Sequence, residues 1–512
     1  MYAKVAEYVF NPLIWLRTVL RSLLKANSAK FGCSQIFIVK KIMLLFSFLF
    51  SEIISSHATT WHVGAAQLYT APSEVSSLVL DGDTVAIDAG TYDSDVAYWA
   101  ANNLFLKGVG GFAHLNANGQ SYGGKAIWVI GGNNTTIDSI EFSGCTVADH
   151  NGAGIRQEGV NLTVRDCYFH DNEEGILAGD NASSDILIEY TEFYNNGYGD
   201  GYSHNLYINH VHSLTFQYNY SHHAIIGHEV KSRAFNNYIL YNRITNEETG
   251  TASREIDLPN GGHTIILGNE IEQGPQSTNS NIIGYGLEGL TNPESQLFVV
   301  NNTIVNDKSN GSFLDVEDGA SLCKAYNNIF AGAGTILTGT PLSLDSSHNL
   351  YSTVNTAGFV DAANYDYQLL SSSPAIDNGT NPGFDSTFSL TPIHEYVHPL
   401  AMMNRIENDS LDNGAHEFGN PSNVFVPEKE PFALFIFPNP VTSSVILKPK
   451  GVLPENSALI IYKLPGYVVK NILVEGRNEI LISVERLPDG IYFWKLVGAN
   501  RKVLAEGKFV KQ

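Results

Sequence analysis

Four basic side chains lie close together near the middle of a very acidic chain. Lys231, Arg233, Arg243 and Arg254 fall within 24 residues, whereas the whole of residues 59–430 holds only 12 Lys and Arg against 44 Asp and Glu. This enrichment indicates an anionic ligand, because guanidinium and ammonium groups bind carboxylates through charge-assisted hydrogen bonds. The surrounding acidity argues against nucleic acid and anionic membranes as partners.

The chemistry that this cluster suggests is β-elimination from a uronic acid. That reaction needs a group that neutralises the sugar carboxylate, a base that removes the neighbouring proton, and an acid that serves the departing glycosidic oxygen. Lys231 or a histidine is the candidate base, and Tyr207 or His228 is the candidate acid. Arg254 completes the predicted catalytic set.

Neighbouring polar residues are predicted to bind the acidic polysaccharide: Arg233, Asn209, Glu255, Asp257 and His204. Glu229 and Asp257 are also candidate ligands for Ca²⁺, which prefers carboxylate oxygens and would help to neutralise the uronate. A simpler alternative is a ladder of compensating surface charges that has no substrate, with Lys231 between Asp257 and Glu229.

The elements that must position these residues are short strands in a repeating coil. The pattern apolar-x-x-(Asn or small)-x-apolar recurs from residues 137, 164, 188, 216, 239, 266, 299 and 325, in steps of 23 to 33 residues. No helical periodicity is sustained between residues 59 and 350. A repeat of this length predicts an all-β parallel β-helix, in which each coil packs on the next.

The fourth position of this pattern is asparagine in five successive coils, at Asn219, Asn242, Asn269, Asn302 and Asn328. Amides stacked at the coil spacing predict a hydrogen-bonded ladder inside a turn. A second strand precedes each copy, and alternation along it places Ile208, Val230 and Ile256 inside. The expected outward rows are then Tyr207–Glu229–Glu255 and Asn209–Lys231–Asp257.

Composition divides the chain into five segments. Residues 1–58 are a predicted signal peptide region, with the apolar run Ile42–Phe50 and a cleavage site before Thr59. Within this region, residues 1–38 are interpreted as an extension upstream of the true start. The β-helix is expected at 59–360, its closing segment at 361–420, a Pro-rich linker at 421–433 and a small β-sandwich at 434–512. The four cysteines show no metal-binding spacing.

Three stretches of the β-helix and its closing segment resemble known families. Asp81–Tyr92 resembles the start of secreted, right-handed, pectate-lyase-like β-helix proteins, and Asp412–Phe418 resembles their closing segment. Over roughly residues 200–310 the chain is distantly similar to the chondroitinase B and alginate lyase group, in which a Lys-Ser pair is followed by an Arg on the next coil. Lys231-Ser232 matches the pair, whereas the Arg position falls at Pro259, with Arg254 as the substitute. The resemblance implies a uronate-containing substrate.

The tail resembles the C-terminal sorting domain of type IX secretion substrates in the Bacteroidetes. The resemblance covers Phe437–Gln512 and includes FPNP, IIYKLPG, LPDGIYFWKL and GKFVKQ in that order. It implies handling by the type IX secretion machinery, followed by release or attachment at the outer-membrane surface.

The most favoured function is therefore that of a secreted, monomeric polysaccharide lyase. A glycoside hydrolase or a uronate epimerase is an alternative on the same fold, with carboxylates at Asp257, Glu229, Glu255, Asp315 and Glu317. A non-catalytic glycan-binding adhesin is a further alternative, because it needs only the solenoid and the secretion domain.

Replacement of the candidate base tests the lyase hypothesis. Lys231→Ala is expected to abolish turnover of the acidic polysaccharide and to leave the circular dichroism spectrum unchanged, because an outward side chain fills no core volume. An unchanged turnover rate in this variant would exclude Lys231 from the reaction.

Overall fold

The structure is a computed structural model of the 512-residue chain. It describes residues 58–386, 388–407, 409–420, 424–425, 434–437, 441–449, 458–463, 467–474, 480–488, 490–497 and 503–511. The predicted signal peptide and most of the predicted linker lie outside the described residues. Among the described helices, none combines the length and the apolar character that crossing a bilayer requires.

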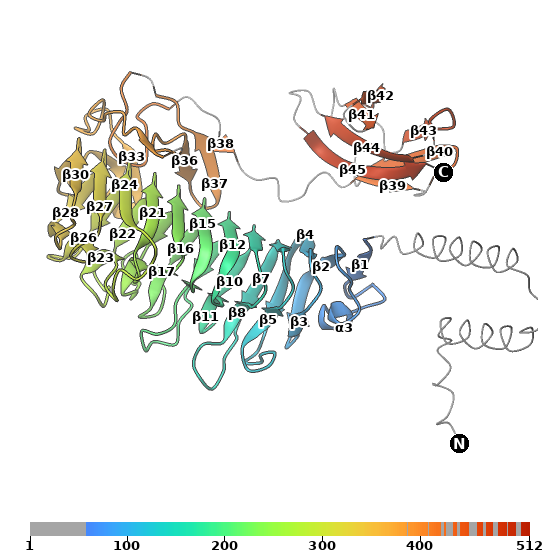
Figure 1. The fold of residues 1–512 in the computed structure, drawn as a ribbon, viewed down its shortest axis with the longest axis horizontal. Coiled ribbons are helices and arrows are strands. Elements are labelled where there is room, and N and C mark those ends of the chain that lie inside the picture. The colour runs from blue at the N-terminus through green and yellow to red at the C-terminus, as the bar shows by residue number, and fades with distance from the viewer. Residues whose placement is uncertain are drawn as a thin grey trace, which may run out of the picture. The chain divides into compact units, whose positions relative to one another are not determined.

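The main body is a parallel solenoid of about ten turns, and each turn gives one strand to a ten-stranded sheet (Figure 1). These strands are β3 (Ala97–Trp99), β5 (Ala126–Ile130), β8 (Ala153–Gln157), β11 (Glu174–Ala178), β14 (Leu206–Ile208), β17 (His228–Ser232), β20 (Arg254–Leu258), β23 (Asn281–Tyr285), β26 (Ser312–Val316) and β29 (Thr335–Thr338).

The rest of each turn belongs to a 21-stranded sheet that consists of two ladders joined through the long strands β2 and β4. The strands are β1 (Thr60–Val63), β2 (Thr84–Asp93), β4 (Phe105–Asn116), β6 (Thr135–Asp138), β7 (Ile140–Ser143), β9 (Leu162–Arg165), β10 (Tyr168–His170), β12 (Asn181–Glu189), β13 (Glu192–Tyr194), β15 (Val211–Gln217), β16 (Tyr220–His222), β18 (Asn236–Leu240), β19 (Arg243–Thr245), β21 (Gly262–Leu267), β22 (Glu270–Gln273), β24 (Ser295–Val300), β25 (Thr303–Asn306), β27 (Leu322–Tyr326), β28 (Ile329–Gly332), β30 (Leu344–Ser347) and β31 (Leu350–Ser352). One short helix, α3 (Ser73–Ser76), packs near the first turns.

The interior of the solenoid is filled by columns of stacked apolar side chains. Phe142, Phe169 and Phe193 lie on successive turns, with ring centroids 4.8 and 5.1 Å apart. This spacing is close to the separation of about 4.8 Å between neighbouring strands. The predicted all-β parallel solenoid is confirmed.

Successive side chains of a strand normally point alternately into the core and out to solvent. In strands of the ten-stranded sheet, the second and third residues both point into the core. Both Ile282 and Ile283 of β23 are in the core, as are Phe313 and Leu314 of β26. In β8, a Cβ at Gly154 would lie 2.7 Å from Cδ1 of the buried Phe169 ring, so this position also faces inward. The backbone thus turns a corner that places two consecutive residues inside.

This corner makes one sequence prediction wrong. Glu229 and Glu255, which were expected to face outward, occupy the second position of β17 and β20 and are fully buried in the interior. Between β14 and β17 the register differs from the expected one by two residues, because Tyr207 pairs with Lys231. Between β17 and β20 the register is as predicted, and Lys231 pairs with Asp257. Asn209 therefore does not share a row with Lys231.

The predicted asparagine ladder is confirmed. Each Nδ2 from Asn219 to Asn302 donates to the Oδ1 of the next member, at 2.9–3.1 Å. The backbone N–H of each of these four residues also donates to Oδ1 of the next member, at 2.9 Å. The structure adds Asn349 as a sixth member, which accepts a bond from Asn328 at 2.9 Å. The ladder satisfies the buried polar groups of a tight turn in which tyrosines such as Tyr218 and Tyr241 take a positive φ.

A mutation in the middle of the ladder tests its energetic weight. Asn269→Ala removes the acceptor for both Asn242 donors and the donor to Ile239 O, and it leaves these buried groups without partners. We expect a loss of about 2–4 kcal/mol in the free energy of unfolding, measured by urea denaturation. The exposed Asn355, mutated to alanine in the same way, is the control and should shift the midpoint little. Equal losses in the two variants would contradict the role of the ladder.

The interior also holds carboxyl groups. Glu229 accepts hydrogen bonds from Asn205, Ser221 and the backbone of Ala224, while burial raises its pKa to about 8. Burial likewise raises the pKa of Glu272 to about 7. Burial and the nearby Glu272 and Glu229 raise the pKa of Glu255 well above its ordinary value. The folded chain therefore holds protons here that the unfolded chain releases near pH 4.5.

These protons make stability depend on pH in a defined direction. Since the folded state binds more protons than the unfolded state above about pH 4.5, stability falls as the pH rises, by about 1.4 kcal/mol per pH unit for each extra proton. Glu255→Gln imitates the protonated acid and should reduce this fall between about pH 5 and 9, as measured by urea denaturation at several pH values. The exposed Glu294, changed to Gln, is the control. Wild-type and E255Q curves that run parallel would contradict the assignment.

A closing segment follows the solenoid. Its elements are β32 (Phe359–Asp361), η1 (Ala362–Asn364), β33 (Asp366–Leu369), β34 (Phe384–Asp385), β35 (Phe388–Ser389), β36 (His394–Val397), β37 (Ala401–Asn404) and β38 (Val424–Phe425). The short β38 lies within the predicted linker and pairs with β37.

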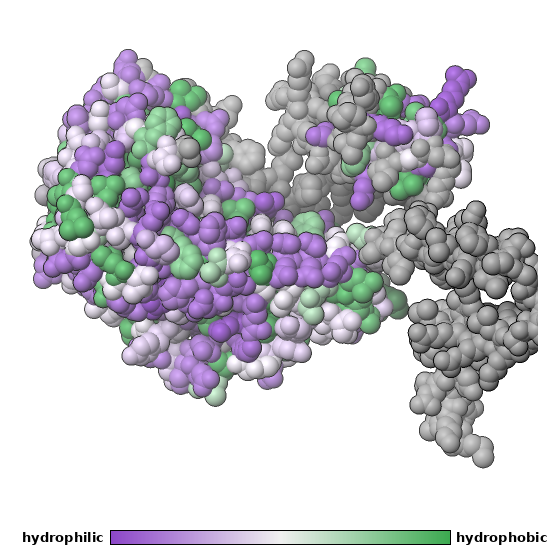
Figure 2. All heavy atoms as spheres, in the orientation of Figure 1, coloured by the Kyte–Doolittle hydropathy of each residue, from purple (hydrophilic) through white to green (hydrophobic). Residues whose placement is uncertain are grey.

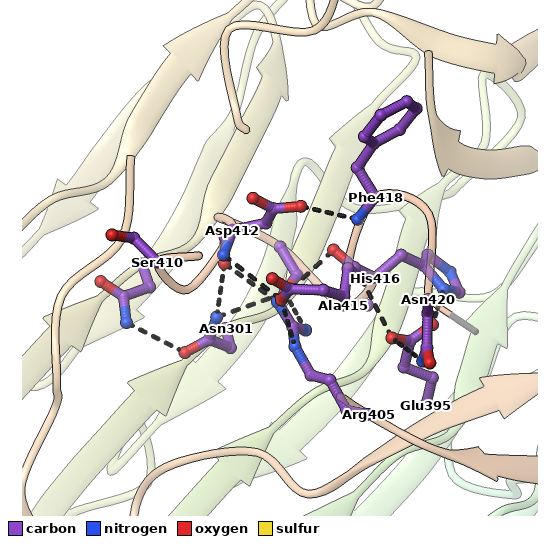
Figure 3. Close-up of polar contacts among 12 residues, drawn as sticks. Asn301, Glu395, Arg405, Ser410, Asp412, Ala415, His416, Phe418 and Asn420 are labelled. Carbon is purple, nitrogen blue, oxygen red and sulfur yellow. Dashed lines mark hydrogen bonds and ion pairs between the residues drawn. The ribbon is translucent and has the colours of Figure 1, made fainter. Parts of the chain in front are cut away.

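The closing segment is attached to the solenoid by a buried polar cluster (Figure 3). Arg405 forms an ion pair with Glu417 at 2.9 Å and donates to the carbonyl oxygens of Asp412 and Gly414. His416 lies between Glu395 of β36 and Glu270 of β22, at 3.2 and 2.6 Å. Hydrogen bonds to these carboxylates outweigh burial and raise the pKa of His416 to about 10.

The C-terminal part folds around a core of its own. One antiparallel sheet contains β39 (Leu434–Phe437), β40 (Ser444–Pro449) and β43 (Ile480–Ser483), and the other contains β41 (Ala458–Lys463), β42 (Tyr467–Leu473), β44 (Gly490–Val497) and β45 (Val503–Lys511). Its buried residues include Leu459, Ile461, Tyr492, Leu496 and Phe509.

Candidate functional site

The candidate site lies on the outward face of the ten-stranded sheet, where two columns of polar side chains run across the turns. One column consists of Tyr207, Lys231 and Asp257, which are paired in register. Beside it, His228 pairs with Arg254, and the ring of His204 stacks on the ring of His228 at 4.8 Å. Hydrophilic residues cover most of the solenoid surface seen in Figure 2, so polarity alone does not distinguish this face.

Lys231 is at the centre of the first column and is mostly buried, with 12% of its side chain exposed. Its Nζ lies 3.8 Å from Oδ2 of Asp257 and 3.8 Å from Oε1 of Glu288. The same ammonium group lies 5.3 Å from the centre of the Tyr207 ring. Lys231 is therefore held over an aromatic ring by two carboxylates.

The two stacked histidines are neutral at neutral pH. The backbone N–H of His228 donates to Nδ1 of His204 at 3.0 Å, which places the proton of the His204 ring on Nε2. Burial, with the charges of Lys231 and Arg254, lowers the pKa of His228 well below its ordinary value. Burial also lowers the pKa of His204. Nε2 of His228 lies 3.4 Å from Oδ2 of Asp257.

Arg233 holds the tyrosine hydroxyl in place. Its Nε donates to Oη of Tyr207 at 2.9 Å, and its two terminal nitrogens donate to Asn260 and to Glu288, the latter at 2.7 Å. Because the guanidinium supplies the proton of the Arg233–Tyr207 bond, the O–H of Tyr207 stays available to donate to another group.

Arg254 extends over a position without a side chain. Gly284 follows Asp257 in the outward column, and a Cβ there would lie 3.1 Å from Cδ and Nε of Arg254. From this position Arg254 donates to Oδ1 of Asp257 at 3.1 Å. Burial raises the pKa of Asp257, and Arg254 and Lys231 oppose this shift. The glycine thus lets the guanidinium lie flat against the sheet.

Several nitrogens of this face have no hydrogen-bond partner among the described residues. They are Nε of Arg156, Nε2 of His204, Nδ1 of His228 and Nε of Arg254. Buried nitrogens in folded proteins are normally paired. All four atoms are buried, so a ligand reaches them only when neighbouring side chains move aside.

The structure brings together seven of the predicted site residues: Tyr207, His204, His228, Lys231, Arg233, Arg254 and Asp257. Glu255 and Glu229 face the interior and so cannot contact a substrate on this face. Asn209 accepts a bond from the backbone of His210 and lies beyond the end of β14.

The predicted calcium ligands do not fit a shared site. Glu229 is inside the solenoid and Asp257 is outside it. Asp257 is also surrounded by Lys231, Arg254 and His228, so a cation there would be repelled by two positive charges.

Three residues of this face were not predicted. Glu174 accepts a bond from the backbone of His204 at 3.0 Å, and burial raises its pKa well above the ordinary value. Arg156 lies on the same face, in register with Leu177. Glu288 comes from the loop after β23. Glu174 and Arg156 could have been predicted from the sequence only if the register between turns of the solenoid had been assigned correctly.

Two family descriptions agree with this architecture. The protein family described as "Right handed beta helix region" matches residues 102–249. The family described as "Secretion system C-terminal sorting domain" matches residues 435–512. No curated protein sequence matches the chain. A solved structure of pectate lyase Pel9A has 12% sequence identity and a TM-score of 0.42, and the match covers 72% of this chain and 98% of that chain.

The chain therefore carries a right-handed β-helix followed by a type IX secretion C-terminal sorting domain. The sorting domain supports secretion or an outer-surface location, and it implies handling by the secretion machinery.

Proposed function

We propose that the protein is a polysaccharide lyase that binds a uronate-containing polysaccharide on the outward face of the ten-stranded sheet and cleaves it by β-elimination. The observation that carries this proposal is the clustering of three cationic and two imidazole side chains on this one face of an acidic domain, namely Lys231, Arg233, Arg254, His204 and His228. A polyanionic sugar chain supplies acceptors for these cationic groups and for the Nε2–H of His204.

In the proposed complex, Lys231 and Arg254 neutralise the uronate carboxylate. Both lie beside Asp257, which balances their charge while the site is empty. Neutralising the carboxylate makes the adjacent C–H more acidic, because negative charge develops on the carboxylate as the proton leaves. Arg254 has an additional unpaired Nε for this purpose.

His228 is the proposed base. Its ring is neutral, and with the Nε2 proton directed at Asp257 the Nδ1 lone pair is left without a partner. A neutral imidazole with a free lone pair can accept a proton, and the negative charge of a uronate bound at Lys231 and Arg254 offsets the two charges that lower the pKa of His228. Lys231, which has two carboxylates beside it, fits the neutralising role better than the role of base.

Tyr207 is the proposed acid. The base takes the proton from C5, the electron pair forms the C4–C5 double bond, the bond from C4 to the glycosidic oxygen breaks, and Tyr207 gives its proton to that oxygen. The hydrogen bond from Arg233 orients Oη and stabilises the phenolate that remains.

Glycoside hydrolysis is the second candidate, and one feature favours it. Asp257 and Asp315 lie in the same outward column with only Gly284 between them. Two strand spacings separate their backbones by about 10 Å. This distance is near the upper end of the separation of about 6.5–9.5 Å between the carboxyl groups of inverting enzymes. Burial raises the pKa of each of them, as an acid catalyst requires.

A substrate panel distinguishes these functions. The purified protein is incubated with alginate, pectate and glycosaminoglycans, and the ultraviolet absorbance of the unsaturated product and the number of new reducing ends are both measured. The proposal expects both signals to rise together. New reducing ends without the absorbance would establish hydrolysis instead. Binding without any product would identify a glycan-binding adhesin.

Removal of one hydroxyl tests the acid. Tyr207→Phe keeps the ring under Lys231 but removes the donated proton, so we expect kcat to fall by about 10²–10⁴-fold with little change in the folded structure. Tyr98→Phe is the matched control, because Tyr98 occupies the same outward column four turns earlier. Full activity in Y207F would exclude Tyr207 as the acid.

A further inference from the structure

A second cluster of side chains that could do chemistry lies on the other sheet of the solenoid, in turns that come before Tyr207 and Lys231. His114 of β4, Glu141 of β7 and His170 of β10 come from three successive turns. Nε2 of His170 lies 3.1 Å from Oε1 of Glu141, and Nε2 of His114 lies 3.6 Å from the same oxygen. One potential ligand atom from each residue lies within 4.8 Å of the other two.

The two separations from Glu141 fit a single metal ion, which would replace the hydrogen bond between Nε2 of His114 and Oγ of Ser143 at 2.7 Å. With metal–nitrogen and metal–oxygen bonds of about 2.0–2.1 Å, two ligands of a tetrahedral site lie about 3.3–3.5 Å apart. The two distances to Glu141 fall on either side of this value. All three side chains are partly exposed, at 16–24%, so an ion can reach them from solvent and keep a position for water.

His170 is also oriented as a metal ligand would be. Its Nδ1 lies 2.7 Å from Oδ2 of Asp171, while Oδ1 of Asp171 accepts a bond from Asn195 at 2.6 Å. A carboxylate on the far nitrogen of an imidazole fixes the ring and its tautomer, and it directs the Nε2 lone pair at the metal. The Tyr168 ring, stacked at 4.4 Å, holds the imidazole from the side.

The type of ligand selects the type of ion. Two imidazoles and one carboxylate suit zinc and similar transition metals, whereas Ca²⁺ and Mg²⁺ prefer sites made of oxygen ligands. We propose that His114, Glu141 and His170 form a binding site for one zinc-class divalent ion on the solenoid surface. This site does not depend on the proposed lyase activity.

Metal titration of the full chain tests the proposal. EDTA-treated protein is titrated with Zn²⁺ by calorimetry, and Co²⁺ is added separately to record its visible absorption. We expect one Zn²⁺ per chain and the intense Co²⁺ bands of four-coordinate geometry. His114→Asn, Glu141→Gln and His170→Asn should each raise the Kd for Zn²⁺ at least tenfold.

The matched control is His212→Asn, because His212 also faces a carboxylate on the solenoid surface, with Nδ1 2.7 Å from Asp185. This variant should bind Zn²⁺ like the wild type. Unfolding curves recorded in EDTA show whether each variant is folded before titration. The proposal is overturned if the folded wild type binds no Zn²⁺. It is also overturned if a variant that carries all three substitutions binds Zn²⁺ as tightly as the wild type. That result would place the ion elsewhere, for example at the neighbouring His222 and His223.

Discussion

The stacking of parallel strands at a fixed spacing is the constraint on which the rest of this structure depends. Each turn must present the same backbone to its neighbours, so a side chain at one position recurs directly above its counterpart about 4.8 Å away. Inside, this builds the phenylalanine column and the asparagine ladder. Outside, it builds the row of Tyr207, Lys231 and Asp257 from residues 50 positions apart. Both stability and the candidate chemistry follow from the same repeat.

The repeat also explains what the sequence could predict. The ladder was predictable because asparagine recurs at a position where its amide can satisfy the same turn in every coil. The solenoid was predictable for the same reason. The register between β17 and β20 was also predictable, whereas that between β14 and β17 was not. The inward direction of Glu229 and Glu255 was not predictable, because the corner places two consecutive residues inside and local alternation misassigns them. Glu174 and Arg156 had no nearby motif, so only the pairing of β8, β11 and β14 connects them to the site.

Charge is distributed differently inside and outside the solenoid. The interior carboxyl groups of Glu229, Glu255 and Glu272 have raised pKa values, because a buried charge is costly and the proton removes it. On the outward face, Asp257 lies among Lys231, Arg254 and His228, and attraction between opposite charges replaces lost hydration. Similar residue types therefore contribute a polar core on one side of the strand and the charged candidate site on the other.

The closing segment has a consequence for how the chain folds. A simple solenoid forms contacts only between adjacent repeats and can grow from either end. Here Tyr218 bonds to His394, Glu270 to His416 and His263 to Asp385, across 176, 146 and 122 residues. Such long loops slow folding, because their closure entropy is lost before the contacts are gained. The middle turns reach their final state only after the closing segment has been synthesised, which favours a late, cooperative last step over folding one turn at a time.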